Sequence, residues 1–191
     1  RNLCLGYLNE LNTPAYLELA GAQFAGADNM TDQFAALALF ANSPGDDGKA
    51  ALGAFYTRWQ REALVVDKWL GVQASSRRTD TLATVKGLLA HPAFDIRNPN
   101  KVYALLRTFG GNHRNFHAAD GQGYRFIAAQ AAALDRLNPQ VASRLARCFD
   151  RWRKFDPVRQ GHAKAALEEL IRQPNLSPDV FEVIEKSLRA L

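Results

Sequence analysis

The sequence predicts an all-α fold, a right-handed superhelical array of paired antiparallel helices. Two observations carry this prediction. Apolar residues recur with helical periodicity along the chain, and the strict alternation typical of strands is absent. In addition, Asn98-Pro99-Asn100, Asn138-Pro139-Gln140 and Ser177-Pro178-Asp179 begin 40 and 39 residues apart, and each pairs an N-cap side chain with a proline at the first helical position. Such a period, with two helices per unit, is typical of armadillo or HEAT repeats.

Prolines mark most of the helix starts. Of the eight prolines, six follow Ser, Thr, Asn or Asp. Such a pair caps a new helix and ends the preceding segment, because the residue before proline is disfavoured in the α region. The six are Pro14, Pro44, Pro99, Pro139, Pro157 and Pro178.

In chain order, the first predicted helix ends before Thr13-Pro14, which starts the second. The polar loops 42–48 and 75–78 precede the fourth and sixth helices, and the turn Asp120-Gly121 precedes the eighth. The remaining starts come from the capped prolines and from apolar periodicity. The predicted helices are 2–11, 14–26, 31–41, 47–60, 62–74, 80–90, 99–109, 122–136, 139–154, 157–172 and 178–190, with a short turn near 112–118.

The predicted helix 139–154 has the clearest pattern. Its apolar residues form a stripe that we expect to be buried: Val141, Leu145, Cys148, Trp152 and Phe155. Basic residues form a second stripe, about 100° around the same helix: Arg144, Arg147, Arg151 and Lys154. This second stripe is either a solvated flank whose aliphatic stems cover the core edge, or a surface that faces an anionic partner or a cavity. The residues alone favour the solvated flank.

Length and composition are those of one ordinary globular domain, 1–191. The net charge of +5 and the pI near 9.4 permit a nucleic-acid or anionic-membrane surface but do not require one. No stretch approaches the ~18 apolar residues that cross a bilayer, and the first residues do not form a signal peptide. Cys4 and Cys148 fit no metal or redox spacing, so we expect buried thiols in a reducing compartment. Because the chain lacks an initiator methionine and opens within a helical pattern, we expect a fragment of a longer polypeptide.

Motifs that would indicate catalysis are weak. His113 and His117 stand at i and i+4, a spacing that lets two imidazoles share a zinc ion on a helix. However, Arg114 stands where the H-E-x-x-H motif has glutamate, and no third ligand suggests itself, so a surface histidine and a capping histidine are favoured. Gly121-Gln122-Gly123 is a poor phosphate loop, since no strand precedes it and no Lys-Ser/Thr follows. We predict no catalytic residue and no metal ligand in this chain.

Several longer strings are more specific than these motifs. They are Asp28-Asn29-Met30-Thr31-Asp32, Asp67-Lys68-Trp69, Asn98-Pro99-Asn100, Phe116-His117-Ala118-Ala119-Asp120-Gly121-Gln122-Gly123-Tyr124 and Asn138-Pro139-Gln140-Val141-Ala142-Ser143-Arg144-Leu145. In this order they resemble the C-terminal helical domain of bacterial aminopeptidase N, a family of gluzincin-type zinc aminopeptidases. The resemblance runs along the whole chain, from Arg1 to Leu191.

The resemblance implies that the parent enzyme removes N-terminal residues from peptides in the cytoplasm. Its zinc belongs to a separate catalytic domain, whose H-E-x-x-H and glycine-alanine-methionine-glutamate-asparagine motifs do not occur here. This chain would then be a non-catalytic bowl of helices that caps the catalytic domain and controls which peptides reach the zinc. Its expected partners are that catalytic domain and the entering peptides, with no specific nucleic acid and no membrane. By itself the chain should have no peptidase activity.

Three residues are candidates for the wall of the substrate channel. Gln140 and Arg144 stand at i and i+4 within the last matched string, so they lie on one side of the helix. The resemblance therefore favours Arg144 as a cavity residue. Tyr103 is the third candidate, at a position where relatives commonly carry arginine, so the charge pattern of the cavity is altered here.

The alternative hypothesis is a free-standing basic helical-repeat scaffold that binds a protein, a peptide or a nucleic acid through its concave face. The upstream reading frame discriminates between the two hypotheses. An H-E-x-x-H segment in the same polypeptide supports the aminopeptidase, whereas a start codon near Arg1 supports the scaffold.

Overall fold

The computed structural model describes residues 1–11, 13–43 and 45–189, and within them it contains helices and no strand. The first half holds α1 (Asn2–Asn9), α2 (Pro14–Gly26), α3 (Met30–Asn42), α4 (Asp46–Trp59), α5 (Ala63–Ala74) and α6 (Thr81–Leu88). The second half holds α7 (Pro99–Val102), the π-helical segment η1 (Tyr103–Arg107), α8 (Thr108–Gly110), α9 (His113–Phe116), α10 (Gln122–Asp135), α11 (Pro139–Ala146), the 3₁₀ turns η2 (Arg147–Phe149) and η3 (Trp152–Lys154), α12 (Pro157–Ile171) and α13 (Pro178–Arg189). The predicted all-α repeat fold is confirmed.

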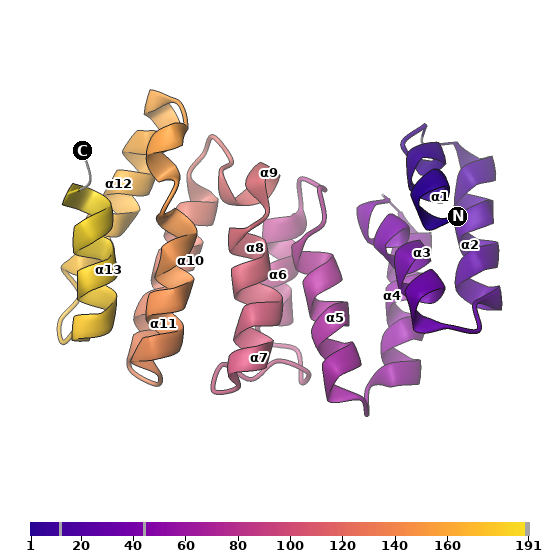
Figure 1. Cartoon of the computed structure of the whole chain (residues 1–191), viewed down its shortest axis with the longest axis horizontal. Coiled ribbons are helices and arrows are strands. Elements are labelled where there is room, and N and C mark those ends of the chain that lie inside the picture. Colours follow the sequence, from indigo (N-terminus) through magenta and orange to yellow (C-terminus); the bar gives the residue numbers. More distant parts are fainter. Residues whose placement is uncertain (12, 44, 190–191) are drawn as a thin grey trace.

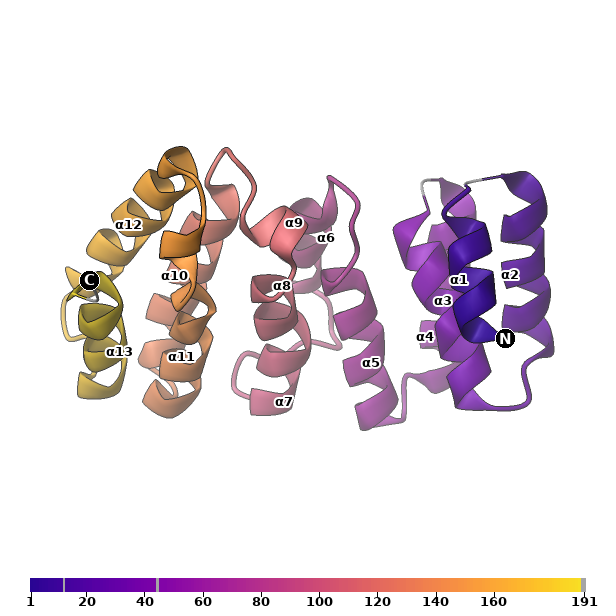
Figure 2. The ribbon, with the colours of Figure 1, turned by 45° about the horizontal axis from the view of Figure 1, so that its top comes forward.

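The helices form two layers along one long axis (Figure 1). One layer runs through α1, α3, α5, the continuous rod α7–η1–α8, α11 and α13, and each of these packs against the next. The second layer, α2, α4, α6, α10 and α12, packs against the first. The first and last helices, α1 and α13, lie toward opposite ends of the array in both views (Figure 2). This is the arrangement of a solenoid, in which each unit contacts mainly its neighbours.

The three Asn/Ser-Pro motifs start equivalent helices of the first layer. Asn98 Oδ1 accepts the amide of Asn100 at 3.0 Å at the start of α7. Asn138 Oδ1 accepts the amide of Val141 at 3.1 Å at the start of α11. Ser177 Oγ accepts the amide of Val180 at 3.3 Å at the start of α13. The sequence period is therefore the length of one two-helix unit, as the capping chemistry predicted.

Polar side chains tie consecutive units together. Ser76 Oγ donates to the Ala41 carbonyl at 2.7 Å, and Asn112 Nδ2 donates to the Ala74 carbonyl at 3.0 Å. Both bonds join residues about one unit apart, 35 and 38 residues in the sequence. The acceptors lie near helix C-termini, where the last carbonyls have no partner within their own helix. These bonds set the position of each unit on its neighbour, and the continuous apolar core supplies the bulk of the stabilisation.

The predicted helix 139–154 is wrong at its C-terminal half. The α-helix ends at Ala146, and two 3₁₀ turns follow. Trp152 lies in the second turn, where its indole Nε1 donates to Ser187 Oγ of α13 at 3.1 Å and its side chain is 4% exposed. Burial of this large side chain against α13 overrides the local helical preference, so the two stripes do not continue on one α-helix.

Other predicted boundaries agree with the structure within about two residues, and residue 190 lies outside the described part. Two further differences concern the rod 99–110 and the cysteines. The rod contains one π turn at Tyr103–Arg107, and Thr108 Oγ1 donates back to the Tyr103 carbonyl at 3.2 Å.

Cys4 is exposed, so its predicted burial is wrong, because α1 turns this side of the helix outward. Burial raises the pKa of the half-buried Cys148 to about 11.

Candidate functional site

The structure brings together two of the three predicted channel residues. Arg144 lies on α11 and Tyr103 opens the π-helical segment on the neighbouring rod. Arg144 Nη1 donates to the Tyr103 hydroxyl at 3.0 Å, although 41 residues separate them in the sequence. That separation is one repeat unit, so the contact joins equivalent helices of adjacent units. Arg144 is exposed and Tyr103 is half-buried.

A second guanidinium completes this group, which we call the Tyr103 cluster: Tyr103, Arg107 and Arg144. The guanidinium carbon of Arg107 lies 5.8 Å from the centroid of the Tyr103 ring, within the range of a cation–π contact. Arg107 was missed at the sequence level. Arg107 stands four residues after Tyr103, a spacing that places the two side chains on one side of a helix. This spacing alone does not distinguish Arg107 from the other exposed arginines.

Two residues of the cluster lie at the ends of a π turn. A π-helical segment accommodates one extra residue per turn, and such segments occur frequently at functional sites. Here it begins at Tyr103 and ends at Arg107, so both side chains of the cation–π pair border the distortion. The rod packs closely on α5, where a Cβ at Gly71 would come within 3.4 Å of the Ala104 carbonyl oxygen.

The cluster carries positive charge that the described residues do not neutralise. Arg147, one turn further on, pairs with Asp150 at 3.6 Å. Arg107 and Arg144 make no such ion pair within the described part of the chain. Guanidinium groups donate bidentate hydrogen bonds to carboxylates and carbonyl oxygens. The cluster can therefore hold the carbonyl or carboxylate group of a peptide.

Gln140 stands one turn before Arg144 on α11 and is exposed. Its backbone carbonyl accepts the Ser143 hydroxyl at 3.0 Å, and no hydrogen bond of its side chain occurs in the described structure. Gln140 thus lies beside the cluster without contacting it, and its role stays a prediction.

The two histidines do not form a zinc pair. His113 is exposed, whereas His117 is buried at the C-cap of the short α9. The Nδ1 atom of His117 shares a 2.8 Å hydrogen bond with the Tyr124 hydroxyl, and its ring stacks on Phe155 at 3.6 Å. Within the described residues, no three His, Cys, Asp or Glu side chains come together as a metal site would require.

His117 should make stability depend on pH. Burial, with His113 and Arg159 nearby, lowers the pKa of His117 from 6.5 to about 4. Between these values the unfolded chain binds more protons, so the free energy of unfolding falls as the pH falls through this window. We expect His117 to contribute about 2 kcal/mol of this loss, less than the full shift because solvent screens part of it.

The measurement is urea unfolding of the chain and of His117→Gln between pH 7 and 4. The stability difference between the two proteins should shrink as the pH falls, because the variant has no imidazole to protonate. A difference that stays constant with pH would contradict the buried neutral imidazole.

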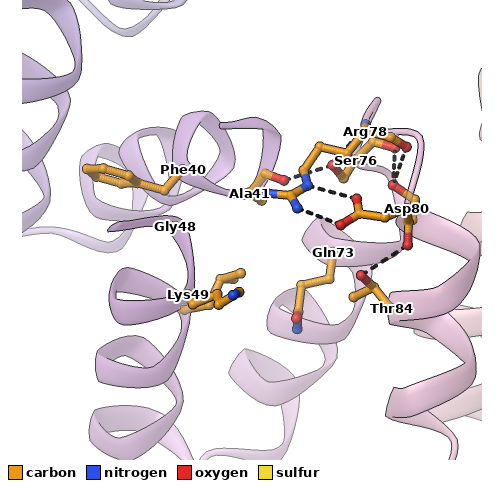
Figure 3. A pocket seen from close by; sticks show the side chains of 11 residues that line it. Phe40, Ala41, Gly48, Lys49, Gln73, Ser76, Arg78, Asp80 and Thr84 are labelled. Carbon is orange, nitrogen blue, oxygen red and sulfur yellow. Dashed lines mark hydrogen bonds and ion pairs between the residues drawn. The ribbon is translucent and has the colours of Figure 1, made fainter. Parts of the chain in front are cut away.

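A separate pocket of about 140 Å³ lies between α3, α4, α5 and α6 (Figure 3). Arg78 crosses its edge and makes two hydrogen bonds to the Asp80 carboxylate, at 2.9 and 2.6 Å. It also donates to the Ser43 carbonyl at 2.6 Å. Hydrogen bonding from Arg78 lowers the pKa of Asp80. The Arg78 guanidinium is thus hydrogen-bonded to other residues of the protein. We therefore interpret this pocket as part of the packing between helices and not as a ligand site.

Comparison with known proteins bears directly on this fold. Residues 1–189 match a family model described as "Domain of unknown function (DUF3458_C) ARM repeats". The chain belongs to this ARM-repeat family. It is 42% identical to aminopeptidase N of Escherichia coli K12 over 98% of its length, and 39% identical to aminopeptidase N of Haemophilus influenzae over 99%.

The fold of this ARM-repeat domain also matches a solved structure. A Legionella pneumophila aminopeptidase A, crystallised in complex with aspartic acid, aligns with the whole chain at a TM-score of 0.94 and 32% identity. The chain spans 22% of the length of each of these three proteins. The resemblance to the C-terminal helical domain of bacterial aminopeptidase N is confirmed. No described helix of the domain is both long and apolar enough to cross a membrane.

Proposed function

We propose that this ARM-repeat domain is the non-catalytic C-terminal part of a zinc-dependent aminopeptidase, where it caps the catalytic domain and controls the access of peptides. The observation that carries the proposal is the similarity to aminopeptidase N along the whole chain. The zinc and the hydrolytic chemistry then belong to another part of the same polypeptide, in a cytoplasmic enzyme. Peptides are its substrates, and the catalytic domain is its partner.

The Tyr103 cluster is the part of the domain that we assign to peptide handling. A layered helical array offers an extended surface for a partner or a ligand. Two guanidinium groups that pair with no carboxylate among the described residues supply donors there for peptide carbonyl or carboxylate oxygens. A group that contacts the peptide away from the scissile bond stabilises the bound substrate and the transition state equally. Such a group lowers KM and leaves kcat unchanged.

Replacement of Arg144 by alanine tests this assignment. In the full-length enzyme, Arg144→Ala should raise KM for short peptides and leave kcat nearly unchanged. The side chain is exposed, so thermal stability should change by less than about 1 kcal/mol, as for other surface substitutions. The measurements are steady-state kinetics on peptides of several lengths, together with thermal melts.

Two variants accompany this test. Tyr103→Phe removes the hydroxyl that accepts from Arg144 and should give a smaller rise in KM in the same direction. Arg172→Ala, at the exposed end of α12, removes a guanidinium outside the cluster and should leave KM unchanged. If the KM of Arg144→Ala is unchanged for peptides of all lengths, Arg144 belongs to a solvated flank of the helix and not to the channel wall. A large loss of stability would instead indicate a structural role.

A further inference from the structure

The π turn in the rod α7–η1–α8 closes at Thr108. The backbone amide of Thr108 donates to the carbonyl of Tyr103, five residues earlier, and to the carbonyl of Leu105. In a regular α-helix this amide would instead bond the carbonyl of Ala104, four residues earlier. A bond that spans five residues is what defines a π turn. The amide of Thr108 therefore closes the wide turn on Tyr103.

The side chain of Thr108 bonds the same carbonyl group. Its hydroxyl donates to the Tyr103 carbonyl at 3.2 Å. Threonine hydroxyls within α-helices usually bond the carbonyl three or four residues earlier, as Thr84 of α6 does with the Asp80 carbonyl at 3.3 Å. A carbonyl oxygen has two lone pairs, and Thr108 supplies a donor for each of them. The hydroxyl bond therefore stabilises the π turn relative to an α-helical turn.

The neighbouring helix α5 lies closely against this turn. A Cβ at Gly71 would lie 3.4 Å from the Ala104 carbonyl oxygen and 3.9 Å from Thr108 Oγ1. Because Gly71 has no side chain, the backbone of α5 itself shields the hydroxyl, and Thr108 is half-buried. Water competes less for a shielded hydrogen bond than for an exposed one.

The π turn also sets the direction of Tyr103. Each residue of an α-helix turns by about 100°, so one extra residue in a turn rotates the two flanking segments by about that angle relative to each other. Val102 before the turn and Phe109 after it are both fully buried, so the core holds both flanks. With the flanks in these positions, the Tyr103 hydroxyl accepts from Arg144 of α11 at 3.0 Å. A regular α-helical turn would require one flank to rotate and would displace Tyr103 from α11.

We infer that Thr108 is a positioning residue for peptide binding: its hydroxyl holds the π turn, and the turn places Tyr103 where it orients the guanidinium of Arg144. This inference rests on the proposed function, in which Arg144 contacts the peptide. A guanidinium that is already held in one orientation loses less conformational entropy when a peptide binds. Thr108 does not contact the peptide, so its effect on binding passes through Tyr103 and Arg144.

Replacement of Thr108 by valine removes the hydroxyl and keeps the shape of the side chain. In the full-length enzyme, Thr108→Val should raise KM for short peptides about threefold, in the range expected for one lost hydrogen bond, and leave kcat nearly unchanged. Thr108→Ser keeps the hydroxyl and should keep the KM of the unmodified enzyme. Thr84→Val is the matched control, because it removes another half-buried helical hydroxyl, on α6, and should leave KM unchanged.

A double-mutant cycle tests whether Thr108 acts through Arg144. In the Arg144→Ala enzyme, adding Thr108→Val should raise KM no further, because the group that it positions is already absent. If the two effects on KM multiply, Thr108 acts by another route and the inference is wrong. A fall in kcat with a much larger loss of thermal stability than in Thr84→Val would also overturn it, since Thr108 would then have a general structural role.

The crystal structure of the full-length Thr108→Val enzyme gives a readout that does not depend on peptidase activity. We expect the Tyr103 hydroxyl to lie beyond hydrogen-bond distance of Arg144, and an unchanged bond would overturn the inference. If Arg144→Ala raises KM and Thr108→Val does not, the positioning role is wrong and the proposed function stands. A broken Tyr103–Arg144 bond in Thr108→Val, with KM unchanged in both variants, would support the positioning of Tyr103 by Thr108 and overturn the assignment of the cluster to peptide handling.

Discussion

Replacement of Asp67 by alanine is expected to lower the free energy of unfolding by about 3–5 kcal/mol, the usual cost of breaking a buried ion pair. Asp67 Oδ1 on α5 lies 2.7 Å from the Lys101 ammonium on α7, and the two side chains are 18% and 11% exposed. Lys101 also donates to the Ala63 carbonyl at 3.1 Å. In Asp67→Ala the ammonium would stay buried with that carbonyl as its remaining partner, so its desolvation would be uncompensated.

Two further variants identify the cause of this loss. The double variant Asp67→Leu with Lys101→Met removes both charges and should recover most of the lost stability, because no unpaired charge remains. Lys49→Ala breaks the exposed pair with Asp46 and should hardly move the urea midpoint. The measurement is urea unfolding followed by circular dichroism. A midpoint for Asp67→Ala equal to that of Lys49→Ala would show that the buried pair contributes nothing.

Replacement of Gly123 by alanine is expected to cost about 3 kcal/mol or more, because the added methyl group meets backbone that cannot easily move. A Cβ at this position would lie 2.4 Å from the carbonyl oxygen of Phe116 and 2.8 Å from that of Asn115. Gly123 lies in the first turn of α10, and this contact lets α10 cross directly over α9. The fully buried Phe116 and Tyr124 pack edge-to-face beside the crossing, with ring centroids 5.1 Å apart, so a shift of α9 would disturb the core.

Gly161→Ala is the matched control for this effect. Gly161 lies within α12, and a Cβ there would meet nothing within 4 Å. The substitution should stabilise the protein by about 0.5–1 kcal/mol, because alanine loses less backbone entropy in a helix. Thermal or urea unfolding of the two variants should therefore give changes of opposite sign. Equal small changes would mean that α9 gives way easily and that the close approach is unimportant.

The helices and their order could be predicted from the sequence wherever nearby residues determine where a helix begins or ends. Each N-cap side chain acts on amides two or three residues away, so Asn98, Asn138 and Ser177 could be recognised without knowledge of the fold. The turn at Asp120-Gly121 is of the same kind, and Gly121 adopts a positive φ of 67° immediately before α10. In contrast, the end of α11 depends on where Trp152 is buried, which is a property of α13 and not of the local segment.

The same distinction between local and tertiary causes applies to the residues of the candidate site. Gln140 and Arg144 could be chosen from the resemblance and from their spacing on one helix, since i and i+4 share a face. The hydrogen bond from Arg144 to Tyr103 could not, because it joins two stacked repeats. The cation–π contact of Arg107 lies on a π turn that the sequence pattern did not indicate. The helical repeat and its period follow from the sequence, because capping and amphipathicity act over a few residues. Which arginines meet follows from the packing of the repeats, since contacts between repeats depend on how each unit packs on its neighbour.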